Sequence, residues 1–183
     1  VALPALRSAL PAEVTVADDI VGAQWTKLLV NQVNALPAVT GLSVQEVVAH
    51  DGLRAVLTRG MRETATVARA KGLHLARIGA VGPDEVALLL SDDPAAGEAV
   101  PRALAARMGD VPNPASTLQS IRRGRATEID ALNGVVVAAG AEGGVATPVN
   151  ALMVELVHEV ERTGEFLDPA AVLARLSASP AQD

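Results

Sequence analysis

The chain has 183 residues, no cysteine, three histidines and a formal net charge of −6. The missing thiols exclude disulfides and thiolate metal sites, three scattered histidines do not make a metal site, and the negative charge argues against nucleic acid or an anionic membrane as a partner. Only Trp25 and Phe166 are aromatic, so the core must be built from Ala, Leu and Val, which favours packed helices. No stretch has the roughly 18 to 20 consecutive apolar residues of a membrane helix, and we expect a soluble cytoplasmic protein.

The N-terminal segment differs in pattern from the rest of the chain. Residues 1–17 combine a short apolar helical fragment, a proline break and the β-like run Val14, Thr15 and Val16. We interpret them as the end of a nucleotide-binding domain or a linker to it, and residues 18–183 as one helical domain.

Capping signals mark the start of the N-terminal helices. Asp18 and Asp19 provide an N-cap and favourable charge for a helix predicted over 20–36, which no proline interrupts. Ser43 and Glu46 form a capping-box pattern before the next apolar run. Apolar spacing and turn residues predict further helices over 51–71, 83–91, 101–108, 116–122, 127–141, 148–162 and 169–176.

Proline and glycine mark the boundaries in the C-terminal half. Thr147 precedes Pro148 as an N-cap residue precedes a proline at the first helical position, and Gly143 and Gly144 end the helix before them. Strand patterns are nearly absent, and there is no repeat of fixed period. The sequence therefore predicts an all-α, multi-helix domain.

A polar stripe crosses the first strong helix. Lys27, Asn31 and Asn34 stand at i, i+4 and i+7, which places them on one side of a helix whose other sides are largely apolar. In one interpretation the stripe is simply the solvated face of an amphipathic helix. In the other, Lys27 lines a partly dry cleft, where burial lowers the pKa of its ammonium group and allows it to polarise a carbonyl and supply a proton. Spacing alone leaves both open.

A second polar group lies around the predicted hinge before residue 129. Glu128 lies at the start of a helix, where the macrodipole favours a carboxylate, so simple charge placement is the alternative to a site role. Asn113 and Ser116 belong to the residue types that form turns and N-caps, which is the alternative to ligand binding for them.

Histidines and glycines offer no further site. His50, His74 and His158 lie in unrelated segments with no carboxylate or hydroxyl at a useful spacing, and we expect surface or capping positions. The glycines within 140–144 follow a helix instead of a strand and do not form Gly-x-Gly-x-x-Gly. Dinucleotide binding by this chain alone is therefore not expected.

Four segments together resemble the C-terminal domain of the ketopantoate reductase family. They read Trp-x-Lys-x-x-x-Asn at 25–31, Asn-x-x-Ser at 113–116, Arg-x-Thr-Glu-Ile-Asp-x-Leu-Asn-Gly at 125–134 and Gly-Val-x-Thr-Pro-x-Asn at 144–150. The third segment is the most specific. The resemblance implies an all-helical domain similar to that of 6-phosphogluconate dehydrogenase, which closes over the substrate beside an N-terminal Rossmann domain that holds NADPH.

The resemblance also implies roles for individual residues in the NADPH-dependent reduction of 2-dehydropantoate to pantoate, on the route to pantothenate and coenzyme A. Lys27 corresponds to the lysine that polarises the ketone and supplies the proton, and Glu128 to the glutamate that hydrogen-bonds the substrate hydroxyl. Asn31 corresponds to a substrate-orienting asparagine, and Asn113 and Ser116 to groups that hold the carboxylate end of the substrate. Because the Rossmann domain is absent, we assign no cofactor-binding residue and expect this chain alone to be inactive.

One position departs from the family pattern. The family's second asparagine would fall at Ala35, whereas this sequence has Asn34 one position earlier, and a rotation of about 100° per helical residue aims that side chain differently. A reductase of a related 2-oxo acid is therefore one alternative. Another is a non-catalytic helical binding or dimerisation module, and a homodimer formed through apolar helices is compatible with each hypothesis.

Overall fold

The computed structural model describes residues 19–178, and every regular element within them is helical. In chain order these elements are α2 (Ile20–Asn31), the 3-10 helix η1 (Gln32–Asn34), α3 (Ala35–Thr40), α4 (Val44–Ala49), α5 (Asp51–Ala70), α6 (Pro83–Leu89), α7 (Pro94–Gly97), α8 (Ala99–Arg107), α9 (Ser116–Arg122), the π-helix η2 (Asp130–Gly134), α10 (Val135–Gly143), α11 (Pro148–Thr163) and α12 (Pro169–Ala178). Within this part of the chain, β-type pairing is limited to one antiparallel bridge between Ile78 and Val81. The predicted all-α class is confirmed, whereas the interpretation of 1–17 lies outside the described residues.

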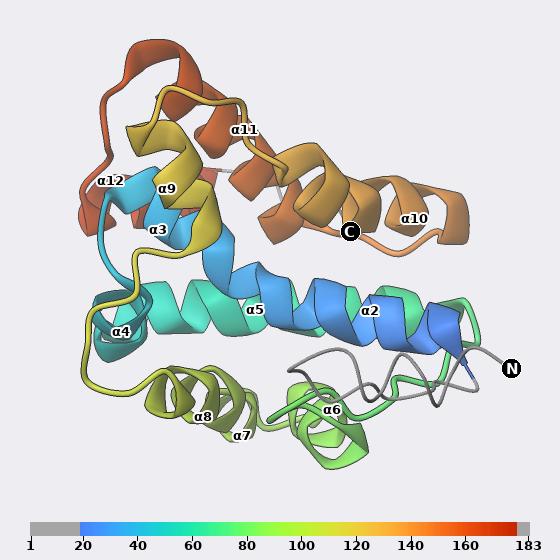
Figure 1. Cartoon of the computed structure of the whole chain (residues 1–183). Helices are drawn as coiled ribbons and strands as arrows, with labels where there is room; N and C mark the ends of the chain where they lie inside the picture. Colours follow the sequence, from blue (N-terminus) through green and yellow to red (C-terminus); the bar gives the residue numbers. More distant parts are fainter. Residues whose placement is uncertain (1–18, 179–183) are drawn as a thin grey trace, which may run out of the picture.

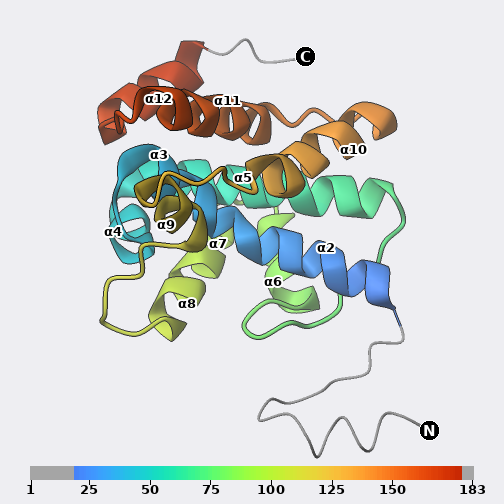
Figure 2. The same ribbon diagram turned by 45° about the horizontal axis from the view of Figure 1, so that its top comes forward.

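The helices form three layers (Figure 1 and Figure 2). The middle layer contains α2 to α5, with α10, α11 and α12 on one side and α6, α7 and α8 on the other. The 20-residue α5 contacts helices of all three layers: α2, α4, α6, α8, α10, α11 and α12. The domain is therefore built around α5.

The core is aliphatic, as the composition predicts. Its largest fully buried side chains include Leu29 of α2, Leu53 and Met61 of α5, and Leu156 of α11, which join the middle layer to the layer of α11. Burying each such side chain contributes about 1.5–3 kcal/mol. A smaller buried cluster around Trp25 holds α2 against the C-terminal part of α5 and against α10.

Several helices begin where the local signals predict. Asp19 caps α2, because its Oδ1 accepts a hydrogen bond from the Gly22 N–H at 2.9 Å. Ser43 and Glu46 form the reciprocal capping box at the start of α4. His50 lies at the N-cap of α5, where its Nδ1 accepts a hydrogen bond from the Leu53 N–H at 3.3 Å, so a capping position is confirmed for this histidine.

Two predicted helices are interrupted. The helix predicted over 20–36 is wrong as a single element, because η1 separates α2 from α3. The tighter turn of η1 accompanies a buried hydrogen bond from the Asn133 side chain to the side-chain oxygen of Gln32, Oε1, at 2.9 Å. The helix predicted from 127 begins only at Ile129 and passes through the π-helix η2 before α10.

No helix in the described part of the chain is both long and apolar enough to cross a membrane.

Candidate active site

The predicted site residues lie on, or within three residues of, the elements α2, α9 and η2. Lys27 and Asn31 belong to α2, Ser116 begins α9, Asn113 lies just before it, and Glu128 lies two residues before η2. α2 contacts η2, and η1 contacts α9. In Figure 1, α9 lies beside α3, to the upper left of α2. The fold thus places η2 against α2 and α9 against η1, and no hydrogen bond within 19–178 joins the side chain of one of the five residues to that of another.

Lys27 projects from α2 toward solvent. Its neighbours Trp25, Thr26 and Leu29 are buried, whereas Lys27 itself is exposed and Asn31 is half-buried. The stripe is therefore the accessible face of an amphipathic helix, and residues 19–178 do not form a dry cleft around the ammonium group. Any desolvation of this lysine must come from something that covers this face.

Asn34 and Ala35, the two positions that could correspond to the family's second asparagine, differ in burial. Asn34 lies in η1 and is half-buried, whereas Ala35 begins α3 and is 1 % exposed. Only Asn34 is accessible from outside the core. Because η1 turns more tightly than an α-helix, the stripe that spacing predicts through Lys27, Asn31 and Asn34 does not continue with unchanged direction beyond Asn31.

Asn113 is held firmly by its own turn. Its side-chain oxygen accepts a hydrogen bond from the Ala115 N–H at 2.9 Å, and its backbone N–H donates to Gln45 Oε1 at 2.9 Å. Its backbone oxygen accepts from the Val44 N–H at 2.9 Å. The turn role predicted for asparagine is therefore confirmed, and the side-chain NH2, which contacts the sulfur of Met108 at 3.4 Å, is the group that remains for a ligand.

Backbone strain precedes Ser116. Ala115 has φ 56° and ψ 157°, and among the described residues it alone combines a side chain with positive φ. Such a conformation costs about 1–3 kcal/mol outside glycine and persists where surrounding structure enforces it, often at functional sites. The turn of Asn113 and the buried methyl group of Ala115 fix this conformation, so Ser116 is presented at a defined, exposed position at the start of α9.

Glu128 lies in the segment between α9 and η2. Its side chain is exposed, and its backbone oxygen accepts a hydrogen bond from the Leu132 N–H at 3.0 Å. The preceding Thr127 N–H donates to Glu161 Oε1 of α11 at 2.7 Å, and the following Ile129 is fully buried. The backbone on both sides of Glu128 is therefore anchored while its carboxylate stays accessible. The π-helix that follows is a rare form that is frequent at functional sites.

A buried amide network joins the two segments that carry these candidates. Asn133 of η2 donates from its side chain to Gln32 Oε1 at 2.9 Å and to Asn150 Oδ1 of α11 at 3.0 Å. The Asn150 side chain in turn donates to Glu63 Oε2 of α5 at 2.7 Å. The network ties η1, which follows Asn31, to η2, which follows Glu128. Sequence reasoning assigned no role to these four residues, although polar side chains between buried apolar neighbours were the available signal.

Glu63 caps α11 from a distance. Its two carboxylate oxygens accept hydrogen bonds from the backbone N–H groups of Val149 and Asn150, each at 2.9 Å. Burial raises the pKa of Glu63, and the hydrogen bonds from Asn150 and Val149 offset only part of that rise. Thr147 occupies the N-cap position, as predicted, but its side chain accepts no hydrogen bond there. The N-cap position predicted for Thr147 is therefore confirmed, although the capping hydrogen bonds come from Glu63 of α5.

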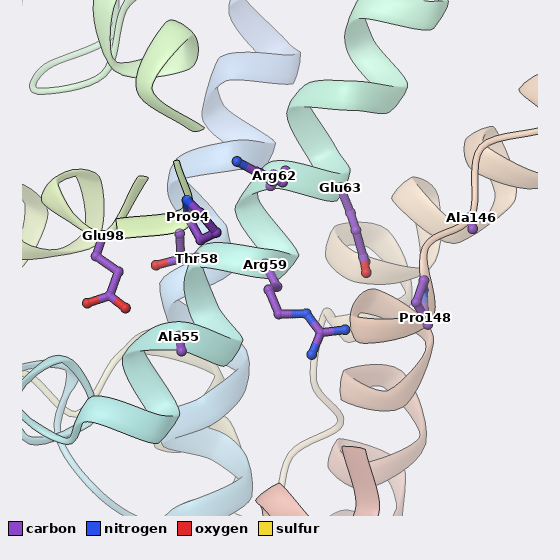
Figure 3. Close-up of a pocket in the computed structure, with 9 residues that line it drawn as sticks. All are labelled: Ala55, Thr58, Arg59, Arg62, Glu63, Pro94, Glu98, Ala146 and Pro148. Carbon is purple, nitrogen blue, oxygen red and sulfur yellow. The ribbon is translucent and has the colours of Figure 1, made fainter. Parts of the chain in front are cut away.

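A cavity of about 500 Å³ lies elsewhere in the molecule and contains none of the predicted site residues. Its walls come from α5, α7 and the start of α11. In the view of Figure 3, α2 lies behind α5. Three of the charged side chains that line the cavity already serve the fold: Glu63 caps α11, Glu98 accepts from Arg54 Nε at 2.6 Å, and Arg62 donates to the backbone oxygens of Leu89 and Ser91. We therefore place the candidate site at α2, η1, α9 and η2.

The histidines differ in their surroundings. His74 is exposed, as predicted. His158 of α11 was predicted to have no carboxylate at a useful spacing, and this is wrong: its Nδ1 lies 2.7 Å from Glu161 Oε2 and its Nε2 lies 3.1 Å from Asp130 Oδ1. Glu161 follows at the i+3 spacing of a helix, whereas Asp130 comes from η2. Within residues 19–178, no group of three or more histidine and carboxylate side chains is arranged to hold a metal ion.

Comparison with known proteins agrees with this arrangement of elements. Residues 19–161 match the family described as ketopantoate reductase PanE/ApbA, C terminal. A 2-dehydropantoate 2-reductase of Caulobacter vibrioides is 34% identical over 158 residues, which cover 86% of this chain and 47% of that protein. A solved PanE/ApbA family ketopantoate reductase from Ralstonia eutropha JMP134 superposes with a TM-score of 0.69 at 35% identity, covering 87% of this chain and 47% of that one.

A more distant match shows the shared fold alone. The ternary structure of D-mandelate dehydrogenase with NADH and anilino(oxo)acetate has a TM-score of 0.61 at 24% identity and covers 80% of this chain and 54% of that one. The present chain spans about half the length of the relatives that it matches. It belongs to the ketopantoate reductase family and corresponds to the all-helical C-terminal domain of that family.

Proposed function

We propose that this chain supplies the substrate-binding and proton-donating half of an NADPH-dependent 2-dehydropantoate 2-reductase, which converts ketopantoate to pantoate in pantothenate and coenzyme A biosynthesis. The observation that carries the proposal is the packing of α2 against η2, because it brings the helix of Lys27 beside the segment of Glu128, with both side chains accessible. Family membership over residues 19–161 supports the same assignment.

The proposed roles follow from the charge that the reaction creates. Reduction of a ketone places negative charge on its oxygen, and a nearby cation that is also a proton donor stabilises that charge and then neutralises it. We assign this role to Lys27. We assign Glu128 as acceptor of the hydrogen bond from the substrate hydroxyl and Asn31 as an orienting amide. Ser116 and the side-chain NH2 of Asn113 are donors, which suits the carboxylate end of the substrate.

The hydride would come from NADPH bound mainly outside this chain. Residues 19–178 hold no parallel sheet with a glycine-rich turn, which is the usual dinucleotide site, so they do not fit this cofactor by themselves. We propose that the other half of the protein is a nucleotide-binding domain to which residues 1–17 lead. Covered by such a domain, the exposed face of α2 would lose water, which strengthens the interaction of Lys27 with a developing oxyanion.

Steady-state kinetics on the full-length reductase test the proposal. With ketopantoate and NADPH, Lys27→Ala should lower kcat by about 100-fold to 10,000-fold, the usual contribution of a positioned acid or base. The matched control is Lys71→Ala, because Lys71 is the other lysine of this chain and ion-pairs with Glu142 at 3.4 Å. This chain without the nucleotide-binding half should show no turnover. An unchanged kcat in Lys27→Ala would remove Lys27 from the mechanism.

A related 2-oxo acid is a second candidate substrate, favoured by one observation. The buried Ala35 offers no polar group where the family has its second asparagine, and Asn34 is accessible one position earlier. The end of the substrate that bears the hydroxyl is where such a change would act. Comparing kcat/KM for ketopantoate with that for 2-oxo acids that lack the hydroxyl decides between them, since a preference for ketopantoate below about tenfold would favour the second candidate.

A further inference from the structure

His158 connects α11 to the segment that carries Glu128. Its Nδ1 lies 2.7 Å from Glu161 Oε2, and its Nε2 lies 3.1 Å from Asp130 Oδ1. We name these three side chains the clasp. Glu161 lies one turn further along α11, whereas Asp130 is the first residue of η2, so the ring bridges two different elements.

Each ring nitrogen of His158 faces a carboxylate oxygen, so both hydrogen bonds form only when the ring carries a proton on each nitrogen. A neutral imidazole carries one N–H and can donate to only one carboxylate, whereas the imidazolium form donates to both. The hydrogen bonds to Glu161 and Asp130 raise the pKa of His158. Burial opposes ionisation of Glu161, but hydrogen bonds from Thr127 and His158 outweigh it and lower the pKa of that carboxyl.

The clasp holds the backbone on both sides of Glu128. On one side, Glu161 Oε1 accepts the hydrogen bond from the Thr127 N–H at 2.7 Å. On the other side, Asp130 contacts the ring of His158. Both anchors belong to α11, which is fixed in the core through Leu156 and Val160. The exposed Glu128 therefore sits between two attachments to one rigid helix.

The other charged side chains near the ring form no ion pair with the clasp within residues 19–178. Glu155 and Glu159 of α11 ion-pair with Arg175 of α12 at 2.5 and 3.1 Å. Arg162 lies one turn after His158 on α11, and Arg125 shares with Glu161 the wall of a second cavity. Neither arginine forms an ion pair with the clasp within residues 19–178. Asp130 and Glu161 are thus the two groups that determine whether the ring holds its second proton.

We propose that His158 is a positioning residue for Glu128, and that protonation of its ring closes the clasp and holds Glu128 where it binds the substrate hydroxyl. The last part rests on the proposed function. When the ring loses its second proton, the lone pair of one ring nitrogen faces a carboxylate, and that contact opens. Glu128 then loses one of its two anchors, which should weaken substrate binding more than it slows the chemical step.

The first experiment measures the clasp without any activity. In NMR titrations of this chain, the ring of His158 should titrate at higher pH than in the urea-denatured chain, and the Thr127 amide signal should shift with the same midpoint. Asp130→Asn and Glu161→Gln should each move the His158 midpoint to lower pH. A Thr127 amide that does not respond to this titration would overturn the coupling, and an unshifted ring midpoint would overturn the clasp itself.

The second experiment measures the effect of the clasp on substrate binding by the full-length reductase. The KM for ketopantoate should rise as pH passes through the His158 midpoint, and His158→Gln should raise KM about tenfold at low pH while kcat changes by less than about twofold. His158→Lys keeps a positive charge, so it should restore a low KM and remove its pH dependence. His74→Gln is the matched control, since His74 is exposed on the loop after α5. Thermal melts confirm that each variant is folded.

The two proposals fail in different ways. If the ring and the Thr127 amide titrate together but the full-length protein reduces no 2-oxo acid, the clasp stands and the proposed function falls. If ketopantoate is reduced but KM is indifferent to His158→Gln and to pH, the proposed function stands and the positioning role of His158 is overturned.

Discussion

Removal of the Glu63 carboxylate is the most informative test of how this domain holds together. Glu63 accepts hydrogen bonds from the Val149 N–H, the Asn150 N–H and the Asn150 side chain, at 2.9, 2.9 and 2.7 Å. A hydrogen bond to a charged group contributes about 1.5–3 kcal/mol, so three would give about 4.5–9 kcal/mol. Desolvation of the carboxylate, which raises its pKa, offsets part of this sum. We expect Glu63→Ala to lower the free energy of unfolding by about 3–5 kcal/mol.

Urea unfolding followed by circular dichroism measures this loss directly. Thr147→Val is the matched control, because the hydroxyl of Thr147 makes no capping hydrogen bond and the replacement has the same shape; it should cost less than about 0.5 kcal/mol. Glu63→Gln retains one acceptor oxygen and should lose an intermediate amount, about 1–2 kcal/mol. The reasoning is refuted if Glu63→Ala unfolds at the same urea concentration as Thr147→Val.

Four further predictions concern stability and use the same unfolding measurement. Leu29→Ala should cost about 2–5 kcal/mol, because the side chain is fully buried; a smaller loss would mean that the core collapses around it. Ala115→Val should cost at least about 2 kcal/mol at its positive φ, whereas Ala115→Gly should stay within about 1 kcal/mol of the wild type; equal losses would contradict the strain. Arg54→Ala should cost about 2–3 kcal/mol, because the buried guanidinium donates hydrogen bonds to Glu98 and to the backbone oxygen of Val48, and Arg54→Lys should not restore the full amount since the bond from Nε is lost; full rescue by lysine would contradict this. The pKa of His158 is raised in the folded state, so its stabilising effect is complete at low pH and is lost as pH rises above about 6.5; the difference between wild type and His158→Gln should shrink over that range, and a growing difference would contradict the sign.

Local signals predicted the helices whose ends depend on neighbouring residues. The Asp19 cap, the capping box of Ser43 and Glu46, and the helix over 116–122 all agree with the structure. In the two capped helices the partner of the capping group lies three residues away, so the sequence contains the whole interaction. The all-α class followed from composition for a similar reason, because it averages over many residues.

Interactions between distant segments explain what was missed. The break at η1 accompanies the hydrogen bond between Gln32 and Asn133, and the cap of α11 comes from Glu63, so neither is visible in a window along the chain. The bridge from His158 to Asp130 is equally non-local. Periodicity assigns a residue to a face of its own helix but carries no information on which polar side chain of another helix meets it there.

The sequence allowed the residues of the candidate site to be named, but it did not predict how exposed the site is. Helical spacing grouped Lys27 with Asn31, and family resemblance added Ser116 and Glu128. Sequence reasoning allowed a partly dry cleft at Lys27, whereas the structure places this lysine in the open. The reason is that burial is a property of all elements that cover a face, and the helices over 19–178 leave this face uncovered. The roles of the individual residues stay predictions.

The distant cap on α11 has a consequence for the order of folding. Helix α11 lacks a hydrogen-bonding side chain at its own N-cap and depends on a carboxylate of α5 that lies more than eighty residues earlier in the chain. An isolated helix of 16 residues is only marginally stable in water. Closing such a long loop precedes the gain from the contact, so α11 should become ordered late, after α5 has joined its nearer neighbours. In kinetic experiments, loss of Glu63 should then accelerate unfolding strongly and leave the folding rate nearly unchanged.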